Sequence, residues 1–164
     1  MRKALLVTLL AAAPLAVPAA AGLPRAGTLV PGRSLGGIRL GESTRAVRAA
    51  LGRGFGVCND CARPTWYFTY KPFHPQGLAV EFARGRVAAV YTLWQPAGWR
   101  STNGLRLGAT PLDVHNRAGR LRTIACSGYD ALVADRPGSR TAYFLYNGSL
   151  WGFGLFLPNW SPCR

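Results

Sequence analysis

The sequence is poor in the side chains that carry most acid–base and metal chemistry. Its 164 residues include 6 Asp and Glu and 2 His, against 20 Lys and Arg. Carboxylates bind hard cations, and carboxylates and imidazoles are the commonest general acids and bases. The chain also has no His-Glu-x-x-His or P-loop motif. These absences predict a protein that is not an enzyme and has no metal site and no cofactor.

The N-terminus has the pattern of a secretory signal peptide. Met1-Arg2-Lys3 precedes an apolar run over residues 4–17, and small residues follow it. The run is shorter than the ~20 residues that a membrane span needs. We therefore predict that residues 1–21 are a Sec-type signal peptide and that no transmembrane span is left after its removal. The predicted location is secreted or periplasmic, outside the cytoplasm.

Four cysteines follow in the exported part of the chain: Cys58, Cys61, Cys126 and Cys163. An oxidising compartment favours disulfides, and four cysteines allow three pairings. We favour Cys58–Cys61 as a local clip and Cys126–Cys163 as a tie between the chain end and the second half. A thiol–disulfide oxidoreductase using Cys58 and Cys61 is an alternative. Such a motif belongs at a strand-to-helix turn, whereas this pair follows a predicted helix.

Two stretches of the chain are similar at a constant offset of 67 residues. The first covers residues 36–53 and the second residues 103–120. Seven positions are identical, namely Gly37, Arg39, Leu40, Gly41, Val47, Gly52 and Arg53 with their partners 67 residues later. The pattern predicts an internal repeat.

Each copy is expected to contain one helix and then antiparallel strands. Ser43 and Thr110 are predicted N-caps, Pro111 suits the first helical position, and Gly52 ends the first helix. Asn147-Gly148 is a strong hairpin signal. Strands are predicted over residues 65–70, 78–84, 86–94, 129–134, 140–146 and 149–157.

The predicted fold class is therefore α+β. Two tandem modules, each a short helix followed by a three- to four-stranded antiparallel sheet, are expected to pack side by side with one sheet face uncovered. The predicted divisions are a signal peptide (1–21), a lead-in (22–35), a first repeat module (36–94), a joint (95–100) and a second repeat module (101–164).

The repeat resembles two known families. The motif Ile38-Arg39-Leu40-Gly41-Glu42-Ser43, with the later segment 78–87, is similar to a pattern shared by the outer-membrane assembly lipoprotein BamE (SmpA/OmlA) family and the tandem-repeat β-lactamase inhibitory proteins. The whole also resembles small secreted actinobacterial proteins of unassigned function. The resemblance implies helix-plus-sheet modules with a shared binding surface. It departs from the families in having Glu42-Ser43 where they favour Met-Thr, and in lacking a lipid-bearing cysteine.

The charge of the exported part is strongly positive. Loss of Arg2 and Lys3 with the signal peptide lowers the net charge from +14 to +12, and Lys71 is then the only lysine beside 17 arginines. Arginine suits phosphate and other anions, so an anionic cell-wall polymer is a candidate partner. The basic residues form no run of five or more, which disfavours a nucleic-acid module.

Aromatic residues gather around the predicted joint and the first strand. Trp94 and Trp99 flank a Pro/Gly loop, Tyr67 lies on a predicted strand, and Arg100 follows the loop. Aromatic side chains on an uncovered sheet form platforms for sugars or proteins. We predict a non-catalytic binding or scaffold protein of the cell envelope or medium that contacts its partner through these four residues. The alternatives are the oxidoreductase and a binder of anionic wall polymer.

Overall fold

The computed structural model of the protein describes residues 22–164, and strands dominate it, with 43% strand against 11% helix. The predicted signal peptide lies outside the described residues. The helices are α1 (Thr44–Leu51) and α2 (Pro111–Ala118). The large sheet has the order β3 (Gly56–Cys58), β4 (Thr65–Thr69), β5 (Gly77–Ala83), β6 (Arg86–Leu93), β11 (Ser149–Phe156), β10 (Ser139–Tyr146), β9 (Tyr129–Arg136) and β8 (Arg122–Cys126). A small sheet has the order β2 (Ser34–Leu35), β1 (Thr28–Val30) and β7 (Arg100–Ser101).

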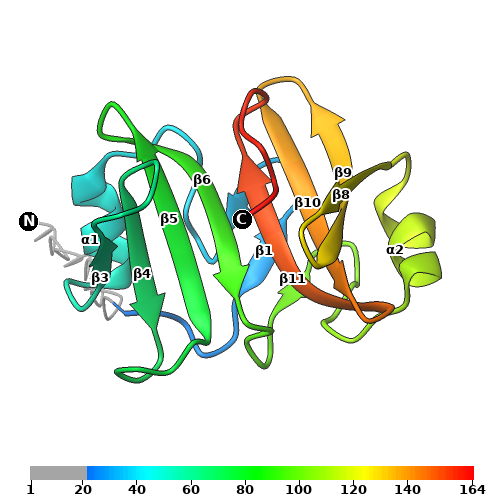
Figure 1. Ribbon diagram of the computed structural model, residues 1–164, viewed down its shortest axis with the longest axis horizontal. Helices are drawn as coiled ribbons and strands as arrows, with labels where there is room; N and C mark the ends of the chain where they lie inside the picture. Colours follow the sequence, from blue (N-terminus) through cyan, green and yellow to red (C-terminus); the bar gives the residue numbers. More distant parts are fainter. Residues whose placement is uncertain (1–21) are drawn as a thin grey trace, which may run out of the picture.

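The predicted fold class, two α+β modules packed side by side, is wrong. All neighbouring strands of the large sheet are antiparallel, and β6 pairs directly with β11, so the strands form one continuous eight-stranded sheet (Figure 1). The pairing matches Tyr91 with Gly154 and Ala89 with Phe156. The physical reason is that a strand edge left unpaired exposes a row of backbone donors and acceptors. Joining β6 to β11 removes two such edges.

The helices begin where the sequence predicts. The Ser43 side chain accepts from the Ala46 amide, and Gly52 follows the end of α1. Thr110 and Asp113 form a capping box at α2, with Pro111 in its first turn.

Matching backbone hydrogen bonds attach each helix entry to the sheet. The amide of Gly41 donates to the Val87 carbonyl at 2.8 Å, and the amide of Gly108 donates to the Leu150 carbonyl at 2.6 Å. The predicted division into repeat modules itself stays a prediction.

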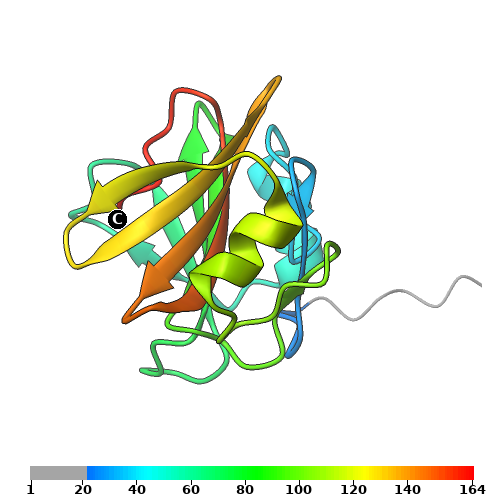
Figure 2. The ribbon, with the colours of Figure 1, turned by 90° about the vertical axis from the view of Figure 1, so that its right-hand side faces the viewer.

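The first face of the large sheet carries the main core. Both helices and the small sheet cover it, and Figure 2 shows α1 and β1 on one side with the C-terminal segment on the other. The core contains large aliphatic and aromatic side chains, and Trp99 is 1% exposed within it. Its indole donates to the Tyr70 hydroxyl at 2.6 Å. The predicted lead-in is therefore part of the fold, since its Leu29 lies opposite Ser101 in the small sheet.

The second face of the large sheet is lined by small residues. Ala79, Ala89, Ala131 and Ala142 are all fully buried on it beside a few aromatic rings. A Cβ at Gly154 would collide with the ring of Phe156, so this position of β11 requires glycine. The C-terminal segment, residues 157–164, crosses this face in front of β6 and β11 (Figure 1). The face predicted to be uncovered is therefore partly covered by the chain itself.

Candidate functional site

An aromatic groove of about 650 Å³ opens at one end of the large sheet. We define the aromatic groove by its ten lining residues, which are His74, Pro75, Gln76, Trp94, Gln95, Ser127, Gly128, Tyr129, Tyr146 and Trp151. They come from the β4–β5 loop, the exit of β6, the β8–β9 turn and the β10–β11 hairpin. Figure 1 shows the β4–β5 loop, the exit of β6 and the β10–β11 hairpin at the same lower end of the sheet.

One wall of the groove is formed by the exit of β6. Trp94 and Gln95 have φ values of 48° and 40°, a conformation that is uncommon for residues with bulky side chains. The turn leaves Trp94 65% exposed. The Gln76 side-chain amide donates to the Gln95 carbonyl at 3.4 Å and connects this wall to the β4–β5 loop. Backbone strain of this kind is concentrated at functional sites.

A second part of the groove lining is a cluster of three aromatic rings. Trp151 contacts Tyr129 and Tyr146 edge to face, with ring centroids 5.9 and 6.2 Å apart. Tyr146 is 52% exposed. The Trp151 Nε1 atom is buried and has no hydrogen-bond partner in the described part of the chain. Buried polar groups normally have a partner, so this indole is an exception among the buried donors of the described residues.

Tyr129 connects the groove to the C-terminal segment. Its hydroxyl accepts a hydrogen bond from the Arg164 amide at 2.6 Å. Burial is the main cause of the raised pKa of Tyr129 and outweighs the lowering by that hydrogen bond. The phenol therefore stays neutral over the physiological range.

Two smaller hollows adjoin the aromatic groove. The first, of about 430 Å³, is lined by Arg100, Arg106 and Trp99 among others and shares Gln95 with the groove. The second, of about 640 Å³, is lined by Arg25 and Lys71 among others. It shares His74 and Gln76 with the groove. We call the two hollows together the basic hollows.

The four predicted contact residues do not form one surface. Trp94 lines the aromatic groove and Arg100 lines a basic hollow. Trp99 contributes to the same hollow but is held in the core, so little of it is accessible. Tyr67 is half-buried on the second sheet face, with its hydroxyl 3.5 Å from the Cys61 sulfur, and lines neither feature.

Sequence reasoning missed the three-ring wall. Tyr146 immediately precedes the Asn147-Gly148 turn, and Trp151 follows it on the next strand. An aromatic pair flanking a two-residue hairpin turn is a usable signal, because a tight turn brings the two side chains close together. The sequence around Tyr129 contains no comparable pattern that would place it in the groove.

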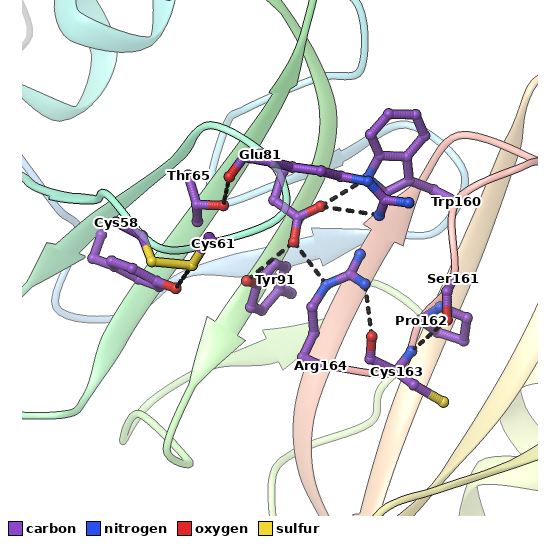
Figure 3. Close-up of polar contacts among 12 residues, drawn as sticks. Cys58, Cys61, Thr65, Glu81, Tyr91, Trp160, Ser161, Pro162, Cys163 and Arg164 are labelled. Carbon is purple, nitrogen blue, oxygen red and sulfur yellow. Dashed lines mark hydrogen bonds and ion pairs between the residues drawn. A yellow bond between two sulfur atoms is a disulfide. The ribbon is translucent and has the colours of Figure 1, made fainter.

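A second polar site, the Glu81 cluster, lies in the middle of the second sheet face (Figure 3). Glu81 is 5% exposed. Its Oε1 accepts from the Tyr91 hydroxyl at 3.3 Å and lies 2.9 Å from Arg164 Nε. Its Oε2 accepts from Trp160 Nε1 at 2.7 Å and lies 3.7 Å from Arg63 Nη1. These five residues define the Glu81 cluster.

The cluster acts as a clamp on the C-terminal segment. Both carboxylate oxygens have partners, and two of these partners, Trp160 and Arg164, belong to the C-terminal segment. The Arg63 guanidinium also lies 4.1 Å from the Trp160 ring centroid. Burial, and then the charge of Glu81, raise the pKa of Tyr91 well above its ordinary value. The tyrosine therefore remains a hydrogen-bond donor.

Both favoured disulfide pairings are confirmed. Cys58–Cys61 closes a separation of three residues and Cys126–Cys163 one of 37. The first pair lies between the end of β3 and the start of β4, which are antiparallel neighbours. No helix begins at it, unlike the strand-to-helix turn where redox-active pairs of this spacing occur. The second pair attaches the C-terminal segment to β8.

The remaining chemistry-bearing residues are scattered. His115 is exposed on α2, while the neighbouring Asp113 accepts from Thr110 in the capping box, an interaction that lowers its pKa. Residues 32–36 spell Gly-x-Ser-x-Gly, but Ser34 lies in β2 beside β1 and not at a strand-to-helix turn.

Residues 22–164 contain no group of three or more possible metal ligands. None of their helices is long and apolar enough to cross a membrane.

The fold is similar to those of three solved bacterial proteins. A DUF4309 family protein, YjgB of Bacillus subtilis, matches with a TM-score of 0.52 and 15% identity over 71% of this chain and 78% of its own. An extracellular protein containing an SCP domain from Bacillus anthracis matches with a TM-score of 0.50 and 9% identity over 73% of this chain. A cysteine-rich secretory protein of Staphylococcus aureus matches with a TM-score of 0.51 and 10% identity over 73%.

These likenesses concern the fold alone. This chain covers 44% of the length of the second and third proteins. No protein-family model and no curated protein matches the sequence. None of the three structures is a BamE or β-lactamase inhibitory protein, and the resemblance to those families stays a prediction.

Proposed function

We propose that this is an exported, non-catalytic protein that binds an extended glycan chain in the aromatic groove. The observation that carries the proposal is the gathering of aromatic side chains in one groove, which Trp94 lines together with Tyr129, Tyr146 and Trp151. Aromatic rings bury a large area at low entropic cost, and a groove of this volume is within the ~300–1,000 Å³ of typical ligand sites. Hydroxyl-rich rings also need hydrogen-bonding groups beside them.

The polar lining of the groove suits a sugar. Gln76, Gln95 and Ser127 are uncharged donors and acceptors. The lining contains one imidazole, His74, and no carboxylate, which supports binding in preference to glycoside hydrolysis by paired carboxylates. The two disulfides and the extracellular or secretory descriptions of two fold neighbours support export.

Affinity gel electrophoresis in gels that contain one soluble polysaccharide each tests the proposal. We expect at least one polysaccharide to retard the wild type and Trp94→Ala to lose the retardation. Leu112→Ala is the matched control, because Leu112 is 68% exposed on α2 and lies outside the groove. Its migration should equal that of the wild type.

Two results would contradict the proposal. One is that no polysaccharide retards the wild type, or that Trp94→Ala is retarded as strongly as Leu112→Ala. The other is that the polysaccharide is shortened after incubation with the protein, as measured by size-exclusion chromatography, since a binding protein leaves its ligand intact.

A further inference from the structure

The basic hollows place four cations beside the aromatic groove without any carboxylate. Arg100 and Arg106 line one hollow, and Arg25 and Lys71 line the other. All four are exposed. None of them forms an ion pair within residues 22–164, where the ion pairs involve Arg63, Arg122, Arg140 and Arg164. The four cations of the hollows share their lack of a carboxylate with most other arginines and differ from them in lining hollows beside the groove. None of the six acidic residues of the chain lines the groove or the basic hollows.

Two of these cations are held against each other by the backbone. Arg100 and Arg106 are partners in an isolated antiparallel bridge, so they lie directly across from one another. Like charges at such a position destabilise the pairing. An anion between the two guanidinium groups would remove the repulsion, and arginine forks match carboxylate and phosphate oxygens.

The three features form a continuous track. The groove shares Gln95 with the first basic hollow and both His74 and Gln76 with the second, and the two hollows share Ala97. A chain whose rings contact Trp94 would therefore bring groups on neighbouring units close to the cations. A neutral sugar would leave all four cations without a counterion.

We infer that the ligand of the aromatic groove is an acidic polysaccharide, whose rings bind in the groove and whose anionic groups bind in the basic hollows. This inference rests on the proposed function and names the class of its ligand. The strong positive charge of the exported part favours an anionic partner at long range, and the basic hollows then fix where its charged groups bind.

Titration calorimetry with one backbone in two charge states tests the inference. The probes are oligogalacturonate and its fully methyl-esterified form, which has the same sugar rings without the charge, in about 0.15 M salt. We expect the acidic oligomer to bind at least about tenfold more tightly than the ester. Arg100→Gln/Arg106→Gln should weaken binding of the acidic oligomer by about tenfold or more. The double variant Arg45→Gln/Arg120→Gln removes the same charge outside the groove and hollows and should change it by less than about twofold.

The outcomes separate this inference from the proposed function. Equal affinity for acid and ester, with both lost in Trp94→Ala, overturns the acidic ligand and leaves the groove as a glycan site. If the two double variants weaken binding of the acidic oligomer equally, the overall charge of the protein and not the basic hollows accounts for the binding. If poly-glutamate binds as tightly as the acidic oligomer, the ligand is an acidic polypeptide and the proposal of a polysaccharide is wrong. If neither oligomer binds but another acidic polysaccharide retards the protein, the same polysaccharide with its acid groups neutralised should not retard it. Equal retardation by the acidic and neutralised forms overturns the acidic ligand. Absence of retardation by every polysaccharide overturns both proposals.

Discussion

The Glu81 cluster and the basic hollows differ in whether their charged groups have partners of opposite charge. In the cluster, one buried carboxylate has two arginines, an indole and a phenol as partners, so each charged group lies within 4 Å of an opposite charge although the two guanidinium groups share one carboxylate. At the hollows, four cations have no carboxylate beside them, and two of them are partners in a backbone bridge. The chain has few carboxylates. None lines the basic hollows, and two arginines share the one buried carboxylate of the Glu81 cluster.

The difference indicates which region is structural and which is available to a ligand. A buried charge is tolerated where its partners surround it, and separating it from them is strongly unfavourable. A bound anion reduces the repulsion between two neighbouring cations that have no counterion. We therefore assign the cluster to holding the C-terminal segment and the hollows to recognition. The predictions below change one region and measure whether the other responds.

Removal of the Cys126–Cys163 disulfide should have the largest effect on stability. In the chain-entropy account, a loop closed over 37 residues contributes about 3 to 4 kcal/mol, and one closed over three residues about half as much. We expect Cys126→Ser/Cys163→Ser to lose more unfolding free energy than Cys58→Ser/Cys61→Ser. Urea unfolding of the two double variants measures the difference. Equal losses would contradict the role of the longer disulfide in fixing the C-terminal segment.

Glu81→Gln should lower the unfolding free energy by about 2 to 3 kcal/mol, because Arg164 and Arg63 lose their counterion and a donor replaces an acceptor. Asp135→Asn is the matched control. Asp135 is half exposed and contacts Arg122 and Arg140 at 3.2 and 2.8 Å, and such surface pairs contribute roughly 1 kcal/mol or less. Thermal unfolding at neutral pH compares them. If the two variants lose the same stability, Glu81 is not a clamp.

Tyr91→Phe should have the smallest effect at neutral pH, about 1 kcal/mol, from loss of one hydrogen bond to Glu81. The effect on alkaline stability is sharper. The pKa of Tyr91 is raised in the folded state, so its contribution is complete below the unfolded value of about 10 and is lost as the pH rises above it. The stability of the wild type should therefore fall more steeply above pH 10 than that of Tyr91→Phe, as followed by urea unfolding. Parallel curves would contradict this.

Local features of the fold could be predicted from the sequence. Ser43, Thr110 and Pro111 define the helix starts because capping depends on a few adjacent residues. Asn147 and Gly148, with φ values of 47° and 71°, form the expected hairpin turn. The disulfide pairing was also recoverable, since the short spacing of Cys58 and Cys61 leaves Cys126 and Cys163 for each other.

Contacts between distant segments could not be predicted. The pairing of β6 with β11 brings Tyr91 opposite Gly154, and nothing in either strand names its partner. The same holds for Glu81, whose contact with Trp160 spans 79 residues. The sequence predicts an accessible Trp99 because it adjoins a Pro/Gly loop, but Gly27, Gly36 and Tyr70 pack against its ring, and only the tertiary fold reveals this. The candidate site was therefore located only in part, through Trp94 and Arg100.

The five tryptophan indole N–H signals give the most direct test of the assignment. The groove contains Trp94 and Trp151, while Trp160 donates to Glu81 and Trp99 to Tyr70. In a two-dimensional nitrogen–proton NMR titration with oligogalacturonate, the signals of Trp94 and Trp151 should shift and that of Trp160 should not. The signal of Trp99 should shift less than those of the groove, because Trp99 lines a basic hollow but is held in the core. The methyl-esterified oligomer should shift them less at the same concentration. A shift confined to Trp160, or equal shifts of all five signals, would contradict the assignment of ligand binding to the aromatic groove and the basic hollows.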